Sequence, residues 1–100
     1  MSFMDLAAVD TGRLRRICEQ YGVASLEVFG SVSRGEDTAE SDIDLLYVLK
    51  PDTQLGFEIF DLEDALADLF GRPVDLVSRH YINRHLRTQI VHDARPLYAA

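Results

Sequence analysis

Two aspartates open the most apolar run of the chain. Asp42 and Asp44 begin the segment DIDLLYVL, in which only hydrophobic residues follow the second aspartate. Side chains two apart on a strand share a face, so a strand here would place both carboxylates together, with Cα atoms about 6.6–6.8 Å apart. Like charges at that distance repel by about 2 kcal/mol at an effective dielectric constant near 20. An Asp-x-Asp pair at a strand start is more often a polar strand edge, but Mg²⁺ would remove the repulsion and make it a metal site.

A third carboxylate and a Gly-Ser pair extend this pattern. Asp75 lies in the segment VDLV, again a single acid among apolar residues, and Gly30-Ser31 precedes Asp42 by ten intervening residues. Backbone N–H groups at the start of a helical turn can bind an anion, and a glycine allows its close approach. The hydroxyls of Ser31 and Ser33 could donate to phosphate oxygens. Phosphate donors beside metal-binding carboxylates are what phosphoryl or nucleotidyl transfer requires.

The elements that must position these residues can be read from hydrophobic periodicity and from glycine and proline. Helical spacing predicts helices and alternating or continuous apolar runs predict strands. The expected elements are a helix over Asp10 to Tyr21, strands over Ala24 to Phe29 and Ile43 to Leu49, a helix over Thr53 to Phe70, a strand over Pro73 to Ser78 and a helix over Tyr81 to His92.

This order predicts an α/β (α+β) fold in which helices flank a small mixed sheet of three or slightly more strands. The 100 residues suit a single domain spanning 1–100. The segment between the first two strands permits either relative direction. The one cysteine, Cys18, excludes an internal disulfide and fits a buried position on the first helix.

Acidic residues are concentrated in the middle of the chain. Twelve of the 17 acidic residues lie between Glu36 and Asp75, where Lys50 and Arg72 are the basic residues. This distribution argues against non-specific nucleic-acid binding and favours a cation site with a separate partner surface. No apolar stretch reaches the roughly 18 residues of a membrane span, and no signal peptide is evident, so we expect a cytoplasmic protein without membrane contact.

The combined pattern resembles the polymerase-beta-like nucleotidyltransferase superfamily. The likeness rests on Gly30-Ser31, Asp42-Ile43-Asp44 and the later strand aspartate Asp75. The longer text FGSVSRGEDTAESDIDLLYVL, followed by GRPVDLVS and DARPLYAA, is similar to the minimal nucleotidyltransferase antitoxins (the MNT, or MntA, type). This resemblance spans about Leu26 to Tyr98.

The resemblance implies a fold, a reaction and a partner. It implies the polymerase-beta-like core, two Mg²⁺ ions at Asp42 and Asp44, and a nucleotide triphosphate held by Gly30 and Ser31. Asp75 would help to hold the catalytic metal and take the proton of the acceptor hydroxyl. The implied reaction transfers AMP from ATP to a tyrosine hydroxyl of a HEPN-domain ribonuclease toxin, with release of pyrophosphate.

Several alternatives remain at this level. Arg34 could contact the triphosphate or could form a surface ion pair with Glu36. A chain of 100 residues offers no second domain to hold an acceptor, which favours a protein acceptor with its own binding surface. Two other functions compete: an antitoxin that only covers its toxin, and a transferase for a small molecule or RNA that works with a separate subunit.

Overall fold

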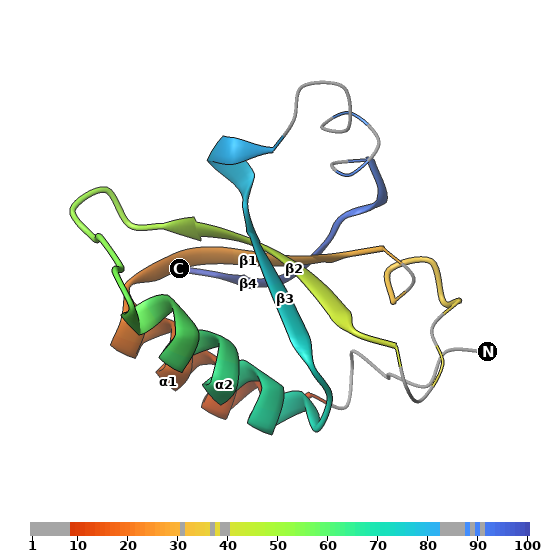
Figure 1. The fold of residues 1–100 in the computed structure, drawn as a ribbon, viewed down its shortest axis with the longest axis horizontal. Coiled ribbons are helices and arrows are strands. Elements are labelled where there is room, and N and C mark those ends of the chain that lie inside the picture. Colours follow the sequence, from red (N-terminus) through yellow and green to blue (C-terminus); the bar gives the residue numbers. More distant parts are fainter. Residues whose placement is uncertain are drawn as a thin grey trace.

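The described part of the chain runs as a helix, two strands, a helix, a strand, a short 3-10 helix and a last strand (Figure 1). The computed structural model describes residues 9–30, 32–36, 38, 41–82, 88, 90 and 92–100. In chain order the elements are α1 (Thr11–Tyr21), β1 (Val23–Phe29), β2 (Ile43–Leu49), α2 (Glu58–Phe70), β3 (Val74–Ser78), the 3-10 helix η2 (Arg79–Tyr81) and β4 (Arg95–Ala99).

The strands form one mixed sheet in the order β3-β2-β1-β4. β1 runs antiparallel to both β2 and β4, whereas β2 and β3 are parallel and are connected through α2. The expected fold class is confirmed, and the open direction of the first two strands is settled as antiparallel. β4 was not identified from the sequence, because RPLYA is short and its ladder depends on β1.

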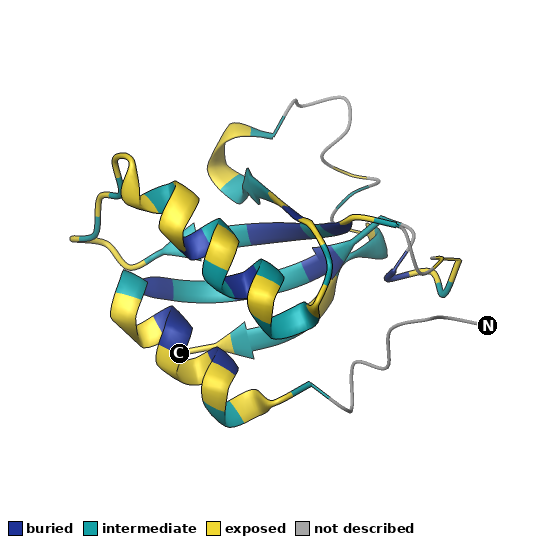
Figure 2. Cartoon of the chain, turned by 60° about the horizontal axis from the view of Figure 1, so that its bottom comes forward, coloured by how far each residue is buried: buried dark blue, intermediate teal, exposed yellow. Residues whose placement is uncertain are grey.

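Both helices cover the same face of the sheet, and their buried residues face the strands (Figures 1 and 2). β2 supplies Ile43 and Leu45 to this interface, both fully buried. Burial raises the pKa of the Cys18 thiol to about 12, as expected for a packed, unreactive thiol. The fully or nearly fully buried core comprises Leu14, Ile17, Cys18, Val23, Leu26, Val28, Val32, Ile43, Leu45, Leu62, Leu66 and Val74.

Helix ends follow local chemistry. Asp10 caps α1 by accepting a hydrogen bond from the Arg13 N–H at 3.0 Å, and Gly22 ends the helix with φ +69°.

α2 begins at Glu58, so the expected start at Thr53 was wrong. The prediction counted Leu55 as helical by its spacing, but the following Gly56 is a poor helix former, and Leu55 packs against the core without being in the helix.

The tail differs from the expected helix over Tyr81 to His92. Tyr81 ends η2, and Ile82 is extended with φ −68° and ψ +136°. Residues 83–87, 89 and 91 of that predicted helix lie outside the described residues. The described positions 88, 90, 92 and 93 are helical, and the Ala94 N–H donates to the Ile90 carbonyl at 3.0 Å.

The sheet face opposite the helices carries an ion pair. Arg79, just after β3, donates from Nη1 to Glu27 Oε1 on β1 at 2.6 Å. Glu27 pairs in register with Leu46, and Leu46 with Val77, so the arginine reaches across β2. In the described part of the chain, no helix has the length and apolar character needed to cross a membrane.

Candidate active site

The Gly-Ser segment forms a tight turn at the end of β1. Gly30 has φ +74°, and its carbonyl accepts from the Arg34 N–H at 3.3 Å and from the Ser33 hydroxyl at 2.8 Å. This hydrogen bond uses the hydroxyl proton of Ser33 within the turn, and the Ser33 side chain is buried, with 2% exposed. Ser31, the other predicted phosphate donor, lies outside the described residues.

Two of the three predicted carboxylates are neighbours across β2 and β3. The parallel register pairs Asp44 directly with Asp75. Residues paired in this way point to the same face, and adjacent strands are about 4.8 Å apart. Asp42 lies just before β2, two positions from Asp44, and is exposed together with Asp75, whereas Asp44 is half-buried. The structure therefore brings all three acids to one end of β2, on the sheet face opposite α1 and α2.

Gly30 connects the turn to these acids. The register places Phe29 opposite Asp44, so the next residue, Gly30, lies against that carboxylate. A Cβ atom on Gly30 would lie 2.5 Å from Asp44 Oδ2, closer than real Cβ contacts come. Both the positive φ and this close approach require glycine. The predicted phosphate-binding turn thus lies directly against one of the predicted metal ligands, Asp44.

Electrostatics at Asp44 are unfavourable for its charged form. Burial is the largest cause that raises the pKa of the Asp44 carboxyl, and the charges of Asp75 and then Asp42 add to it. The guanidinium of Arg34 partly opposes this effect. Like charges near a half-buried carboxylate are a cost to the fold that a bound cation would relieve.

The chemistry of this donor set suits a hard divalent cation. Among the described residues, no group of three or more His, Cys, Asp or Glu side chains is arranged to hold a metal by itself. Mg²⁺ normally binds one or two carboxylates and completes its shell with water and substrate phosphates. Asp42, Asp44 and Asp75 therefore fit Mg²⁺ that arrives with a nucleotide better than a closed protein cage.

Arg34 is held by two carboxylates beside the turn. Its Nε lies 3.2 Å from Glu36 Oε2, the ion pair that the sequence allowed, and its Nη1 lies 3.3 Å from Asp93 Oδ2. The hydrogen bond that Arg34 donates to Glu36 is the largest cause that raises the pKa of Arg34. These contacts use Nε and Nη1, and the side chain is 43% exposed, so other donors of the guanidinium stay available beside the turn.

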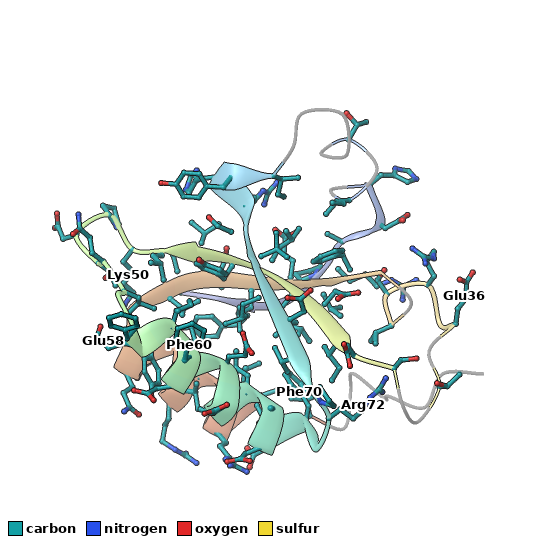
Figure 3. The ribbon with its side chains drawn as sticks, in the orientation of Figure 1. Glu36, Lys50, Glu58, Phe60, Phe70 and Arg72 are labelled. Carbon is teal, nitrogen blue, oxygen red and sulfur yellow. The ribbon has the colours of Figure 1, made fainter. Side chains whose placement is uncertain are left out.

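Sequence patterns did not single out two residues that support the site. Asp93 reaches Arg34 from 59 positions away, and Arg72 donates to the Ser41 carbonyl immediately before Asp42. In Figure 3, Arg72 and Glu36 lie toward this end of the sheet, and Lys50 and Glu58 lie at the opposite end. Neither contact leaves a periodic or motif signal, because each joins distant parts of the chain.

Two hollows of the surface lie away from the three acids. One cavity of about 570 Å³ is lined by residues at the opposite end of the sheet, among them Glu19, Gly22 and Asp52. The acids instead lie at the other end of the sheet, where Asp42 and Asp75 are exposed.

Comparisons with known proteins give a consistent result. Residues 12–98 match the family model described as Nucleotidyltransferase domain. MJ0128 of Methanocaldococcus jannaschii, named as a candidate protein adenylyltransferase, is 42% identical over 76 residues, which cover 75% of this chain and 76% of that protein.

Solved structures share the fold. A candidate minimal nucleotidyltransferase has a TM-score of 0.75 and 36% identity, covering 97% of this chain and 100% of that one. A mutant of the toxin–antitoxin pair MntA–HpeT gives a TM-score of 0.68 and 25% identity, covering 91% of this chain and 73% of that one.

Proposed function

Because this chain belongs to the nucleotidyltransferase domain family, we propose that it transfers AMP from ATP to a tyrosine hydroxyl of a HEPN-domain toxin. The transfer silences the toxin, so the protein acts as an antitoxin. The family predicted from the Gly-Ser and Asp-x-Asp pattern is confirmed, and the acceptor, the metals and the residue roles are the content of the proposal.

The observation that carries the proposal is the contact between the turn and the acids. Gly30 lies against Asp44, and Asp44 is paired in register with Asp75. Phosphoryl transfer needs phosphate donors next to carboxylates that hold the bridging cation, and this contact would bring the proposed donors and ligands together. Supporting it, the relative MJ0128 is named as a candidate protein adenylyltransferase, and the similar MntA chain forms a toxin–antitoxin pair.

The proposed step is an in-line displacement at phosphorus. The tyrosine oxygen forms a bond to the α-phosphorus of ATP while the bond from that phosphorus to the oxygen of pyrophosphate breaks. Pyrophosphate leaves with the electron pair of the broken bond, and the phenolic proton passes to the Asp75 carboxylate. Asp75 suits this role because it is exposed to an incoming acceptor and lies beside Asp44.

The other residues bind and orient. Asp42 and Asp44 would hold two Mg²⁺ ions with Asp75, and these ions, when bound, neutralise the charge that develops on the phosphate oxygens. Gly30 allows the triphosphate to approach the backbone of the turn, where Ser31 would donate to it. Ser33 keeps the turn closed through its bond to the Gly30 carbonyl, and the remaining donors of Arg34 would bind a phosphate.

The direct test incubates the full chain with a HEPN toxin, ATP and Mg²⁺ and measures the intact mass of the toxin. We expect a gain of one or more adenylyl groups on tyrosine with the wild type, and no gain with Asp44→Asn. Asp68→Asn is the matched control, because Asp68 is an exposed acid on α2 outside the site. An unmodified toxin with folded wild-type protein would refute the enzyme and favour an antitoxin that acts by covering.

A further inference from the structure

Asp42 is exposed and stands outside β2, yet the peptides on both sides of it are fixed by one dipeptide. On its N-terminal side, the Ser41 carbonyl accepts from Arg72 Nη2 at 2.7 Å and from Arg72 Nε at 3.0 Å. On its C-terminal side, the Ile43 N–H donates to the Pro73 carbonyl at 2.9 Å. The backbone of Asp42 is therefore held from Arg72 and Pro73.

The same guanidinium closes the turn that leads into Asp42. Arg72 Nη2 also donates to the Thr38 carbonyl at 3.0 Å, and that carbonyl accepts from the Ser41 N–H at 3.1 Å. The Thr38 N–H in turn donates to Ser41 Oγ at 2.8 Å. The planar fork of an arginine can serve two carbonyls at once, which the ammonium of a lysine cannot do in the same geometry.

The end of α2 determines where Arg72 lies. Gly71 leaves the helix with φ +69°, and the N–H groups of Gly71 and Arg72 both donate to the Ala67 carbonyl, at 2.8 and 3.3 Å. Pro73 follows and β3 begins, with Asp75 as its second residue. Figure 3 shows Arg72 at this start of β3. One short turn thus places Asp75 directly and Asp42 through hydrogen bonds.

We infer that Arg72 is a positioning residue for the metal site: it fixes Asp42 relative to Asp44 and Asp75 before the nucleotide arrives. The inference rests on the proposed function, since it gives Asp42 the role of a metal ligand. Groups that orient metal ligands commonly change metal affinity by about 10–100-fold when they are removed. A loose Asp42 would raise the Mg²⁺ requirement and leave the Gly30 turn unaffected.

The test compares Arg72→Lys with Arg79→Lys in the full chain. Arg79 is the matched control because it forms its own tertiary contact, with Glu27, and does not touch the segment around Asp42. In metal-free protein, we expect amide hydrogen exchange of the 38–43 segment to become about 10-fold faster in Arg72→Lys alone. Calorimetry should show that half-saturation with ATP needs about 10-fold more Mg²⁺, with ATP binding in EDTA changed less than about twofold.

Recovery at high Mg²⁺ separates positioning from simple damage. Raising Mg²⁺ should return the toxin-transfer rate of Arg72→Lys to within about twofold of wild type. A folded Arg72→Lys with wild-type exchange and wild-type Mg²⁺ dependence would overturn the inference, and so would faster exchange spread evenly over the sheet. If wild type fails to bind ATP with Mg²⁺, the proposed function fails, while the exchange data still decide whether Arg72 fixes this segment.

A second variant covers the case in which Arg72→Lys does not fold. Ser41→Ala removes the Oγ acceptor of the Thr38 N–H and so loosens the same turn. It should raise exchange over 38–43 and the Mg²⁺ requirement in the same direction, by about threefold or more. An unchanged Mg²⁺ requirement in that variant would count against a fixed Asp42 segment.

Discussion

Two neighbouring rows of residues on the sheet face opposite α1 and α2 hold partly buried carboxylates in opposite electrostatic surroundings. In one row Glu27 lies opposite Leu46, and its carboxylate is paired with Arg79 at 2.6 Å. In the adjacent row Asp44 lies beside Asp75, and no ion pair joins Asp44 to a basic side chain within the described residues. Glu27 and Asp44 are both partly buried, but Glu27 has a counter-ion in the chain, whereas Asp44 faces the like charges of Asp75 and Asp42.

The difference lies in what each carboxylate needs for its charge to be balanced. A partly buried charge with its own partner is satisfied by the fold and needs nothing from outside. A partly buried charge among like charges costs stability, and that cost is repaid when a cation binds. The Glu27 row is therefore satisfied within the fold, and the Asp44 row is the one that the proposed function assigns to magnesium and nucleotide.

The largest expected effect is on the rate of AMP transfer, which should fall strongly for a substitution in the Asp44 row and little for one in the Glu27 row. Asp75→Asn should lower the rate of AMP transfer by about 10³-fold, because it removes the proposed proton acceptor and a metal ligand. Glu27→Gln should leave transfer within about threefold of wild type once folding is matched. Rates are measured as labelled AMP on the toxin, and equal losses in both variants would remove the distinction between the rows.

The next largest effect, on ATP binding, tests the contact between Gly30 in the turn and Asp44. Gly30→Ala should weaken ATP binding by about 10-fold or more, since a Cβ there collides with Asp44 Oδ2 and the residue keeps φ +74°. It should also lower the free energy of unfolding by about 1–3 kcal/mol. Gly35→Ala is a useful comparison, because its φ is +71° and nothing lies within 4 Å of its Cβ position. Equal ATP affinities for the two variants would argue that the contact with Asp44 is irrelevant.

Removing the charge of Glu27 and removing the charge of Asp44 should change the free energy of unfolding in opposite directions. Glu27→Gln should lower the free energy of unfolding by about 1–2 kcal/mol, because it leaves the Arg79 guanidinium without its carboxylate. Asp44→Asn should raise it in metal-free buffer, because it removes the repulsion. Urea unfolding of both variants in EDTA measures this, and a loss of stability in Asp44→Asn would contradict the account.

The smallest effect is the pH dependence of the stability that Asp44 contributes. The raised pKa of Asp44 means that the folded state binds its proton more tightly than the unfolded state, so its contribution to stability falls as pH rises from about 3.8. The advantage of Asp44→Asn over wild type should therefore be complete near pH 7 and vanish below about pH 4. Urea unfolding in EDTA at a series of pH values checks this, and an advantage independent of pH would point to another cause.

Local chemistry made much of this site predictable. Alternation and apolar runs located β1 and β2, and the positions of Gly30, Asp42 and Asp44 follow directly from where those strands end and begin. Asp75 was identified because a single acid in an apolar strand is unusual. These features depend on residues close together in the sequence, which is why periodicity and spacing recover them.

Contacts between distant segments could not be predicted in the same way. β4 is stable because it pairs with β1, and nothing within RPLYA indicates that partner. The Arg34–Asp93 ion pair and the bonds from Arg72 to the Thr38 and Ser41 carbonyls depend on the register of β2 with β3 and on the end of α2. Side chains that bond backbone carbonyls leave no pattern, since any residue supplies a carbonyl.

Thermal unfolding of wild type and Asp44→Asn, with and without Mg²⁺ and ATP, tests the central claim most directly. Without ligand, Asp44→Asn should melt a few degrees higher, since about 1 kcal/mol corresponds to roughly 4–8 °C in a domain of this size. With saturating Mg²⁺ and ATP, the order should reverse, because only wild type gains the energy of binding. If the ligand raises both melting temperatures equally, the acids beside Gly30 are not a magnesium-nucleotide site.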